Sequence, residues 1–271
     1  MKATVIVDNI GNERIFGEWG LCIHIEYKGK NILLDTGASS LFIRNAEQLN
    51  ISLKDIDFAV LSHAHYDHGN GMSDFFEIND KATFYLQEGC KENCYAKKWV
   101  FRKYIGLPQG VLAAYKDRIV YATDNFEICD GVSLIPHRTP HLEEIGKREG
   151  MYQKSSTGWI PDNFCHEQSL VLDTAEGLVV FNCCSHGGVI NIIREVSEAY
   201  PGKTVAALIG GFHLYNKSQK EVRQLAREIQ KTGIQYIYTG HCTGKKAFGW
   251  LHEELGDMIK QLEIGLEISN I

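Results

Sequence analysis

Three histidines and one aspartate fall within six residues of the sequence, in the stretch VLSHAHYDHGNG. They are His63, His65, Asp67 and His68, and an apolar run ending at Leu61 precedes them. Imidazole and carboxylate are the ligands expected for zinc, iron or manganese. His63 and His65 are two residues apart, so both can reach one ion, whereas Asp67 and His68 can serve a second. The spacing predicts a site for two adjacent divalent metal ions.

Two ions need further ligands, and other polar turns after apolar runs supply candidates. His186 lies in NCCSHGG after LVVF, His213 in GGFH after AALI, and His241 in GHCTG after YIYT. Ligand sites in α/β folds collect at the carboxyl ends of strands, so these turns are expected to converge on one pocket. We predict that His186 and His241 bind metal, and that His213 either binds metal or contacts substrate.

Two adjacent metal ions suggest hydrolytic chemistry, because a bound metal lowers the pKa of a water molecule from about 15.7 towards about 7. Asp67 is a candidate proton shuttle besides its ligand role. Asp35, in the turn after NILL, is expected to orient a histidine and the loop rather than to bind metal. The remaining strand and surface histidines are interpreted as structural; they include His24, His166 and His252.

Most of the eight cysteines are expected to be reduced, because nothing in the chain marks it as secreted. The pair Cys90 and Cys94 in CKENC has one residue too many for a CxxC motif, and no second pair matches it. We therefore do not expect a structural zinc site there.

The elements that must position these loops are predicted from hydrophobic periodicity. Short apolar runs indicate strands, and runs with apolar residues at helical spacing indicate helices. The expected strands are Ala3–Val7, Cys22–Tyr27, Asn31–Leu34, Phe58–Leu61, Ala82–Leu86, Leu178–Phe181, Thr204–Ile209 and Gln235–Thr239. The expected helices are 39–50, 187–200, 218–233 (with a capping box of Ser218 and Glu221), a last helix through Ala247 and Leu255, and a short helix within 94–106.

This order predicts an α/β fold, a four-layer αββα sandwich in a single domain of residues 1–271. The middle of the chain has weak periodicity and holds four of the five prolines, so we interpret residues 88–168 as an insertion that forms a lid. Three of its side chains, Lys97, Arg102 and Trp159, are expected to contact substrate, with Lys98 as a further cation.

Composition narrows the class of partner. The net charge of -6 argues against nucleic acid, which binds clustered Lys and Arg, and no run is long enough to span a membrane. The N-terminus has no signal-peptide pattern, so a cytoplasmic location and a small-molecule substrate are expected. Homo-oligomerisation is left open.

Taken together, HAHYDHGNG and the upstream LLDTG resemble the metallo-β-lactamase fold superfamily. CCSHGGVIN, IGGFHL and TGHCTG are similar to the subgroup named for dihydropterin-ribofuranosylaminobenzene-phosphate synthase. The resemblance implies a dinuclear site at the edge of an αββα sandwich, with His63, His65 and His186 on the first metal. It assigns Asp67, His68 and His241 to the second. Zinc at two sites is expected, with iron or manganese as alternatives.

One position departs from the family pattern. Where hydrolytic members have a bridging aspartate, this chain has Cys184. Cys184 either binds metal as a thiolate, or the metals lack a bridging carboxylate, or only one site is tightly filled. A thiolate favours zinc or iron over manganese.

Three functions fit these residues. The leading hypothesis is a metal-dependent hydrolase, phosphoesterase-like, of a small phosphorylated or heterocyclic substrate. The alternatives are a synthase-type condensation of a pterin with an arylamine ribosyl phosphate, and a non-hydrolytic redox sensor built on Cys183, Cys184 and Cys242.

Overall fold

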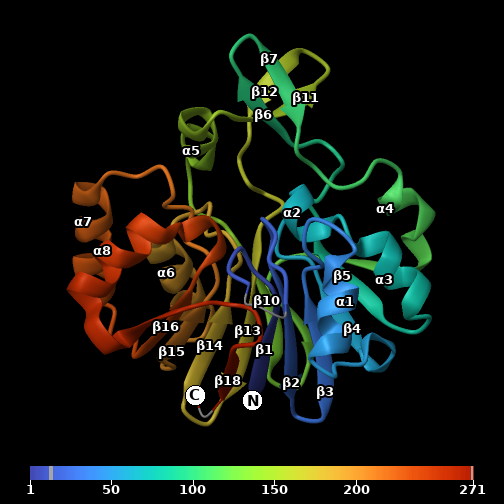
Figure 1. The fold of residues 1–271 in the computed structure, drawn as a ribbon. Coiled ribbons are helices and arrows are strands. Elements are labelled where there is room, and N and C mark those ends of the chain that lie inside the picture. The colour runs from blue at the N-terminus through green and yellow to red at the C-terminus, as the bar shows by residue number, and fades with distance from the viewer. Residues whose placement is uncertain (12–14, 270) are drawn as a thin grey trace.

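The computed structural model describes residues 1–11, 15–269 and 271, and its centre consists of two large sheets packed face to face (Figure 1). The first sheet has the strand order β18 (Glu267–Ser269), β1 (Lys2–Val7), β2 (Cys22–Tyr27), β3 (Lys30–Leu34), β4 (Phe58–Val60), β5 (Thr83–Gln87) and β8 (Ile119–Ala122). The second has the order β17 (Ile259–Gln261), β16 (Tyr236–Thr239), β15 (Val205–Ile209), β14 (Gly177–Phe181), β13 (Gln168–Thr174), β10 (Val132–Pro136) and β9 (Phe126–Cys129).

Helices cover the outer face of each sheet. The first sheet is covered by α1 (Leu41–Gln48) and α3 (Met72–Ile78), with the short α4 (Val111–Ala114) beside them. The second is covered by α6 (Val189–Ala199), α7 (Gln219–Gln230) and α8 (Lys245–Leu255). The fold is therefore the predicted four-layer αββα sandwich.

Strand alternation explains why the layers stay together. In β14, Val179 and Phe181 point into the core between the sheets, while Leu178 and Val180 pack under the helices. Successive strand residues face opposite sides, so a strand buried on both faces is apolar throughout. Three apolar layers result, one between the sheets and one beneath each helical layer.

A third, smaller sheet stands above one end of the sandwich (Figure 1). Its strand order is β12 (Gly158–Pro161), β11 (Met151–Ser155), β6 (Tyr95–Lys98) and β7 (Phe101–Tyr104), and α5 (Leu142–Glu149) directly precedes β11. The backbone N–H of Tyr66, in the short helix α2 (Tyr66–Gly69), donates to the carbonyl of Ile105. The small sheet is thus attached to the histidine-rich loop.

Two expectations for the middle of the chain need correction. The predicted short helix within 94–106 is a hairpin, in which Lys98 pairs with Phe101 across a turn where Trp99 has φ 58°. Aromatic residues favour strands, and that preference prevails because the segment has no apolar helical face. Within 88–168, β8, β9 and β10 complete the two large sheets, so only the small sheet and its connections stand apart from the sandwich.

Parallel strands bring the polar turns to one edge. β3, β4, β5 and β8 run parallel to each other, as do β14, β15, β16 and β17. The turns after β3, β4, β14, β15 and β16 therefore meet at the end of the sandwich below the small sheet, opposite the two termini (Figure 1). Among the described residues, none of the helices has the length and apolar character of a membrane-spanning segment.

Candidate metal centre

The first group of ligand atoms at this edge comes from His63, His65 and His186. One ring nitrogen of each lies within 4.8 Å of the others, and all three side chains are buried. Burial lowers the pKa of His65 to about 3, and it also lowers those of His63 and His186 well below the ordinary value. The three rings are therefore neutral, which is the state in which imidazole binds a metal ion.

The second group consists of Asp67, His68, His241 and Cys184. Oδ2 of Asp67 lies 3.5 Å from Nε2 of His241 and 3.8 Å from Nε2 of His68. The two Nε2 atoms are 3.2 Å apart, and Sγ of Cys184 is 3.3 Å from Nε2 of His68. Two ligands of one tetrahedral zinc ion lie about 3.3 to 3.8 Å apart when the metal–ligand bonds are about 2.0 to 2.3 Å. These four separations therefore match the spacing of ligands around one metal ion.

Unpaired nitrogens test whether metal ions fit here. Among the described residues, Nε2 of His63, Nε2 of His65 and both ring nitrogens of His186 are buried without a hydrogen-bond partner. A buried polar atom left unpaired costs about 1 to 3 kcal/mol. Metal ions between these rings would satisfy one nitrogen of each ring, so the residues fit the cofactor that their chemistry implies.

Asp35 holds the histidine loop in place. Its Oδ2 lies 2.7 Å from Nδ1 of His68, and its two oxygens accept hydrogen bonds from the backbone N–H and the hydroxyl of Ser62, both at 2.7 Å. The Ser62 hydroxyl in turn lies 2.9 Å from Nδ1 of His63. Asp35 therefore orients one histidine of each group and leaves the opposite nitrogen of each ring facing the metal positions.

Comparison with known proteins agrees with this geometry. The model of the Metallo-beta-lactamase superfamily matches residues 20–146. The 7,8-dihydropterin-6-methyl-4-(beta-D-ribofuranosyl)-aminobenzene-5'-phosphate synthase of Methanocaldococcus jannaschii is 27% identical over 267 residues, covering 94% of this chain and 90% of that protein. The crystal structure of Tm1679, a metal-dependent hydrolase of the beta-lactamase superfamily, superposes with a TM-score of 0.83 at 24% identity, covering 100% of this chain and 99% of that one. This chain is a metallo-β-lactamase-fold protein.

A zinc-bound relative in fold is also known. The structure of Zn²⁺-bound PqqB from Methylobacterium extorquens matches with a TM-score of 0.60 at 12% identity, covering 100% of both chains. The predicted resemblance to the superfamily and to the synthase-named subgroup is confirmed.

In this metallo-β-lactamase-fold protein, Cys184 lies between the two groups. Its Sγ falls within 4.8 Å of ligand atoms of His63 and His68, and it also groups with His186 and His213. Its nearest thiol neighbour is Cys242, with the two Sγ atoms 3.4 Å apart. The sequence predicted Cys242 only as part of the thiol cluster of the redox-sensor alternative, and not as a metal ligand, although it directly follows His241 in GHCTG.

The electrostatics of this thiol pair favour one thiolate. Burial opposes ionisation of Cys242, but Cys184 and His241 outweigh it and hold the pKa of Cys242 well below its ordinary value. Burial raises the pKa of Cys184. The pair thus places a thiol and a thiolate beside the second group.

His213 lies beside the first group. Its ring is 4.5 Å from that of His186, and within the described chain neither of its buried ring nitrogens has a hydrogen-bond partner. The backbone of His213 has φ 48°, and Asp35, Ser185 and His241 also have positive φ. Such conformations cost about 1 to 3 kcal/mol in non-glycine residues and concentrate at functional sites.

Two residues that the sequence reasoning missed hold His241. The backbone N–H of His241 donates to Oδ2 of Asp8 at 3.0 Å, and Oδ1 of Asn9 lies 3.1 Å from its Nδ1. Both residues follow directly after β1, which runs parallel to β3 because each pairs with β2 in antiparallel fashion. The polar turn after the first strand was therefore the signal that could have found them.

Glu167 is a third missed residue, and it holds the loop of His186. Its two carboxylate oxygens accept the backbone N–H groups of His186 and Gly187, each at 3.0 Å. Glu167 is 1% exposed, and nothing local in the sequence indicates that a charged residue at this position is buried.

The three side chains predicted to contact substrate lie on the small sheet. Arg102 stacks over the rings of Tyr152 and Trp159, with its Cζ 4.6 and 4.8 Å from the two centroids, while Lys97 is exposed. Another pair of cations, Arg148 and Lys217, lines a cavity of about 170 Å³ that also contacts His186 and His213. This cavity was not predicted, because its cations come from α5 and from the turn before α7.

Proposed function

We propose that this protein is a metal-dependent hydrolase, phosphoesterase-like, of a small phosphorylated or heterocyclic substrate. The observation that carries the proposal is the pair of adjacent ligand groups, His63, His65 and His186 on one side and the shell around Asp67 on the other, with Cys184 between them. Metal bound there, zinc at two sites with iron or manganese as alternatives, would supply a Lewis acid and an activated water.

The residues of the chain divide the remaining work. Burial alone would raise the pKa of Asp67, but His68 and His241 outweigh it and hold the pKa well below its ordinary value. Asp67 therefore stays ionised, which suits a ligand better than a proton acceptor. His213 has two unpaired nitrogens in the described structure and faces the first group, so we assign it the proton transfer to the leaving group.

The cavity beside His213 accounts for recognition of an anionic group. Arg148 and Lys217 contribute two positive charges to its lining and Glu149 one negative charge, which leaves a net charge of one. Lys217 is paired with Glu149, whose side chain is 5% exposed, and the pair is thereby held at the cavity wall. A phosphate bound here lies against His186, next to the first metal position.

Turnover of bis-p-nitrophenyl phosphate and of pterin phosphates, measured with metal and after chelation, tests the proposal. Removing a residue that hydrogen-bonds to a metal ligand lowers activity or metal affinity by roughly 10- to 100-fold. The turnover of His186→Ala is expected to fall by more than this, because His186 itself is a proposed ligand. His252→Ala is the matched control, since His252 is exposed on α8. Absence of metal-dependent turnover across a broad panel of phosphoesters would contradict the proposal.

A synthase-type condensation is the second candidate. It is supported by the 27% identity to the dihydropterin-ribofuranosylaminobenzene-phosphate synthase, which extends over 94% of this chain. A pterin difference spectrum on titration of the protein, followed by product formation with an arylamine ribosyl phosphate, favours this reaction. Hydrolysis without pterin binding excludes it.

A redox sensor on the same fold is the third. Sγ of Cys184 and Sγ of Cys242 are 3.4 Å apart, so a small movement would let the two thiols form a disulfide when an oxidant is present. Iron-type visible absorption that changes with oxidant, without any hydrolysis, would favour a sensor over an enzyme.

A further inference from the structure

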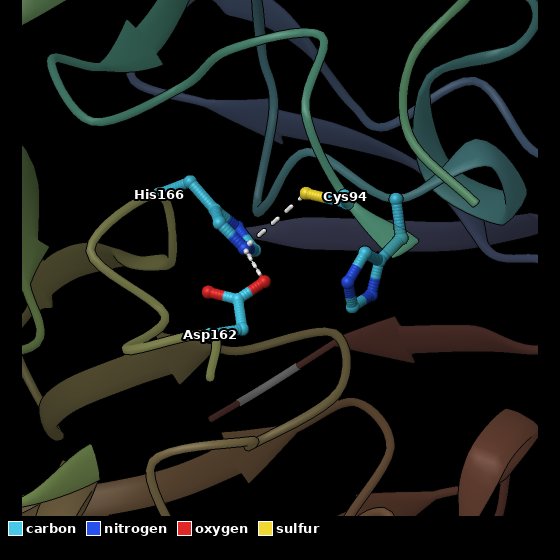
Figure 2. A group of neighbouring side chains, drawn as sticks. Cys94, Asp162 and His166 are labelled. Carbon is cyan, nitrogen blue, oxygen red and sulfur yellow. Dashed lines mark hydrogen bonds and ion pairs between the residues drawn. The ribbon is translucent and has the colours of Figure 1, made fainter. Parts of the chain in front are cut away.

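A buried cluster adjoins His65 on one side of the metal positions. It consists of Cys94, Asp162 and His166, which are 2%, 0% and 1% exposed, and Figure 2 shows the first two converging on the His166 ring. Nε2 of that ring lies 3.2 Å from Oδ2 of Asp162 and 3.6 Å from Sγ of Cys94. Its Nδ1 accepts the backbone N–H of Ala64 at 3.2 Å. Because both ring nitrogens are occupied, the cluster supports the histidine loop and has no ring nitrogen left for a substrate.

Two partly exposed aromatic side chains adjoin other histidines of the centre. Trp19 is 43% exposed and Tyr215 is 53% exposed. The ring of Trp19 lies 5.2 Å from that of His241, and the ring of Tyr215 lies 5.2 Å from that of His213. The two side chains form an aromatic pair with an edge-to-face contact, their centroids 5.8 Å apart and their planes at 87°. Such a contact uses the edge of one ring and one face of the other, so further ring surface stays open to a ligand.

Hydrogen bonds on both sides fix the backbone of Trp19. The N–H of the preceding residue donates to the carbonyl of Asp8 at 3.2 Å, and the N–H of Gly20 donates to Oδ1 of Asn9 at 3.3 Å. The same turn after β1 holds His241. The indole ring and this histidine are therefore positioned together.

Tyr215 is fixed by the loop that carries Cys242. The backbone N–H groups of Leu214 and Tyr215 donate to the carbonyl of Cys242 at 3.0 and 3.2 Å. Gly244 permits the close approach, since a Cβ at this glycine would lie 3.0 Å from Cβ of Tyr215. Side chains on a backbone held in this way lose little conformational freedom when they bind a ligand.

The aromatic side chains of the small sheet are engaged with one another. The ring of Trp159 lies 4.8 Å from that of Tyr95, and Cζ of Arg102 lies 4.8 Å from the centroid of Trp159. The aromatic pair differs, because it contacts rings of the metal centre itself. It is therefore better placed than the small sheet to hold the reacting end of a substrate.

His213 borders both the aromatic pair and the cavity of Arg148 and Lys217. Its ring contacts that of Tyr215, and it also lines the cavity. A substrate whose anionic group occupies the cavity would pass His213 before it reaches the aromatic pair. A flat aromatic ring suits that position, because stacking on Trp and Tyr adds to the effect of burying its surface.

We propose that Trp19 and Tyr215 bind a flat aromatic ring in the leaving group of the substrate, while the cavity binds its phosphate. The inference rests on the proposed hydrolase function, in which His213 delivers a proton to that leaving group. The substrate class is therefore a phosphate ester of a ring-bearing alcohol or phenol. Stacking of a flat ring on an aromatic side chain contributes about 5- to 150-fold in affinity.

Two phosphonates of equal carbon number test whether a flat ring is recognised. Phenylphosphonate has a flat ring, cyclohexylphosphonate has a puckered one, and neither has an ester bond to hydrolyse. In calorimetric titrations of the zinc-supplemented protein, the wild type is expected to bind phenylphosphonate at least about 5-fold more tightly. Trp19→Leu and Tyr215→Leu keep an apolar side chain but remove the flat face, so each is expected to reduce this preference. Trp19→Phe is expected to retain most of it.

Trp99→Leu and Tyr236→Leu are the matched controls. Trp99 is 90% exposed at the turn between β6 and β7, and Tyr236 begins β16, at the end of that strand away from His241. An unchanged preference in both Trp19→Leu and Tyr215→Leu would overturn the proposal. An equal loss of affinity for both phosphonates would also overturn it, because the aromatic pair would then only support the fold of the centre. If Trp19→Leu does not fold, Tyr215→Leu decides the outcome, since it replaces a side chain that is 53% exposed.

The binding measurement is independent of turnover. A ring preference that Tyr215→Leu removes, in a protein that hydrolyses no phosphate ester, would support the aromatic site and contradict the hydrolase. Metal-dependent hydrolysis of phosphate esters by a protein with no preference for phenylphosphonate would support the hydrolase and overturn the aromatic site.

Discussion

At the residue scale, the proposed active centre depends on side chains whose neighbours decide what they can do. His63 and His68 offer one nitrogen each to the metal positions because Ser62 and Asp35 occupy the other. Cys184 offers a sulfur where a carboxylate is expected in hydrolytic relatives, and it is the residue shared by both ligand groups. The chemistry of the centre is therefore set as much by Asp35 and Cys184 as by the histidines.

Replacing Asp35 tests the orienting role. Asp35→Asn keeps the size of the side chain but removes the charge that pairs with His68, so metal affinity is expected to fall by about 10- to 100-fold. Affinity is measured by competition with a chromogenic chelator. Asp173→Asn serves as the control, because Asp173 forms an ion pair with Lys203 away from the histidine loop. Equal affinity in wild type and Asp35→Asn would show that the loop holds its shape without this contact.

Replacing Cys184 tests what the sulfur does between the two groups. Cys184→Ala is expected to lose the second metal ion preferentially, since it removes one of four atoms with the spacing of a single shell. Cys184→Asp supplies a carboxylate and is expected to restore two-metal binding and to shift preference towards manganese. Metal analysis of both variants tests whether Cys184 is a ligand. Cys129→Ala is the control for loss of a thiol. Two ions bound by Cys184→Ala would mean that the sulfur is not a ligand.

At the element scale, strand ends position the centre and helices fix the strand ends. Short apolar runs in the sequence were sufficient to predict most strands of the two large sheets, and apolar residues at helical spacing predicted the helices that cover them. These patterns could not predict the β6–β7 hairpin, β8 or β9, because these strands are short and partly exposed and are defined by their neighbours. β10 is buried throughout, but its segment VSLIP was not among the apolar runs interpreted as strands. Asp8 and Asn9 were missed because their partner His241 lies 233 and 232 residues away. Glu167 was missed because no local pattern shows that its carboxylate is buried.

One such long-range contact joins β10 to α6 and gives a pH-dependent prediction. Nδ1 of His137 lies 2.7 Å from Oε2 of Glu195, whose other oxygen accepts the backbone N–H of Arg138. Burial lowers the pKa of His137, but Glu167 and Glu195 outweigh it and raise the pKa above its ordinary value of 6.5. The pKa of Glu195 is below its ordinary value of 4.5, since His137 outweighs the effect of burial.

The stabilisation from this pair is therefore largest between pH 4.5 and pH 6.5. It decreases as the pH rises through the folded-state pKa of His137, and also as the pH falls through that of Glu195. Glu195→Gln is expected to lower the free energy of unfolding by about 1.5 to 3 kcal/mol in that window, and by less above it. Urea unfolding at several pH values measures this, with Glu198→Gln, 71% exposed one turn away, as the control. A pH-independent loss would exclude the charged pair.

At the scale of the whole molecule, the two ligand groups join the two halves of the sandwich. His63, His65, Asp67 and His68 come from the turn after β4 of the first sheet, whereas Cys184, His186 and His241 come from turns after β14 and β16 of the second. Metal bound by both groups would thus close one end of the molecule, where unpaired imidazole nitrogens face each other across the interface.

Metal removal is therefore expected to destabilise the whole fold and not only the loops. A ligand that binds only the folded state adds about 4 kcal/mol when its concentration is about a thousand times its Kd. Thermal unfolding of the chelated protein should occur at a lower temperature, and the midpoint should rise with added zinc. Leu208→Ala is the control, because it creates a cavity beneath the helices of the second sheet, away from the metal positions. It is expected to lower the free energy of unfolding by about 2 to 5 kcal/mol with or without metal. The rise of the unfolding midpoint with zinc should be unchanged. A midpoint that does not move with zinc, in protein shown to bind it, would mean that the two halves are held together by their apolar layers alone.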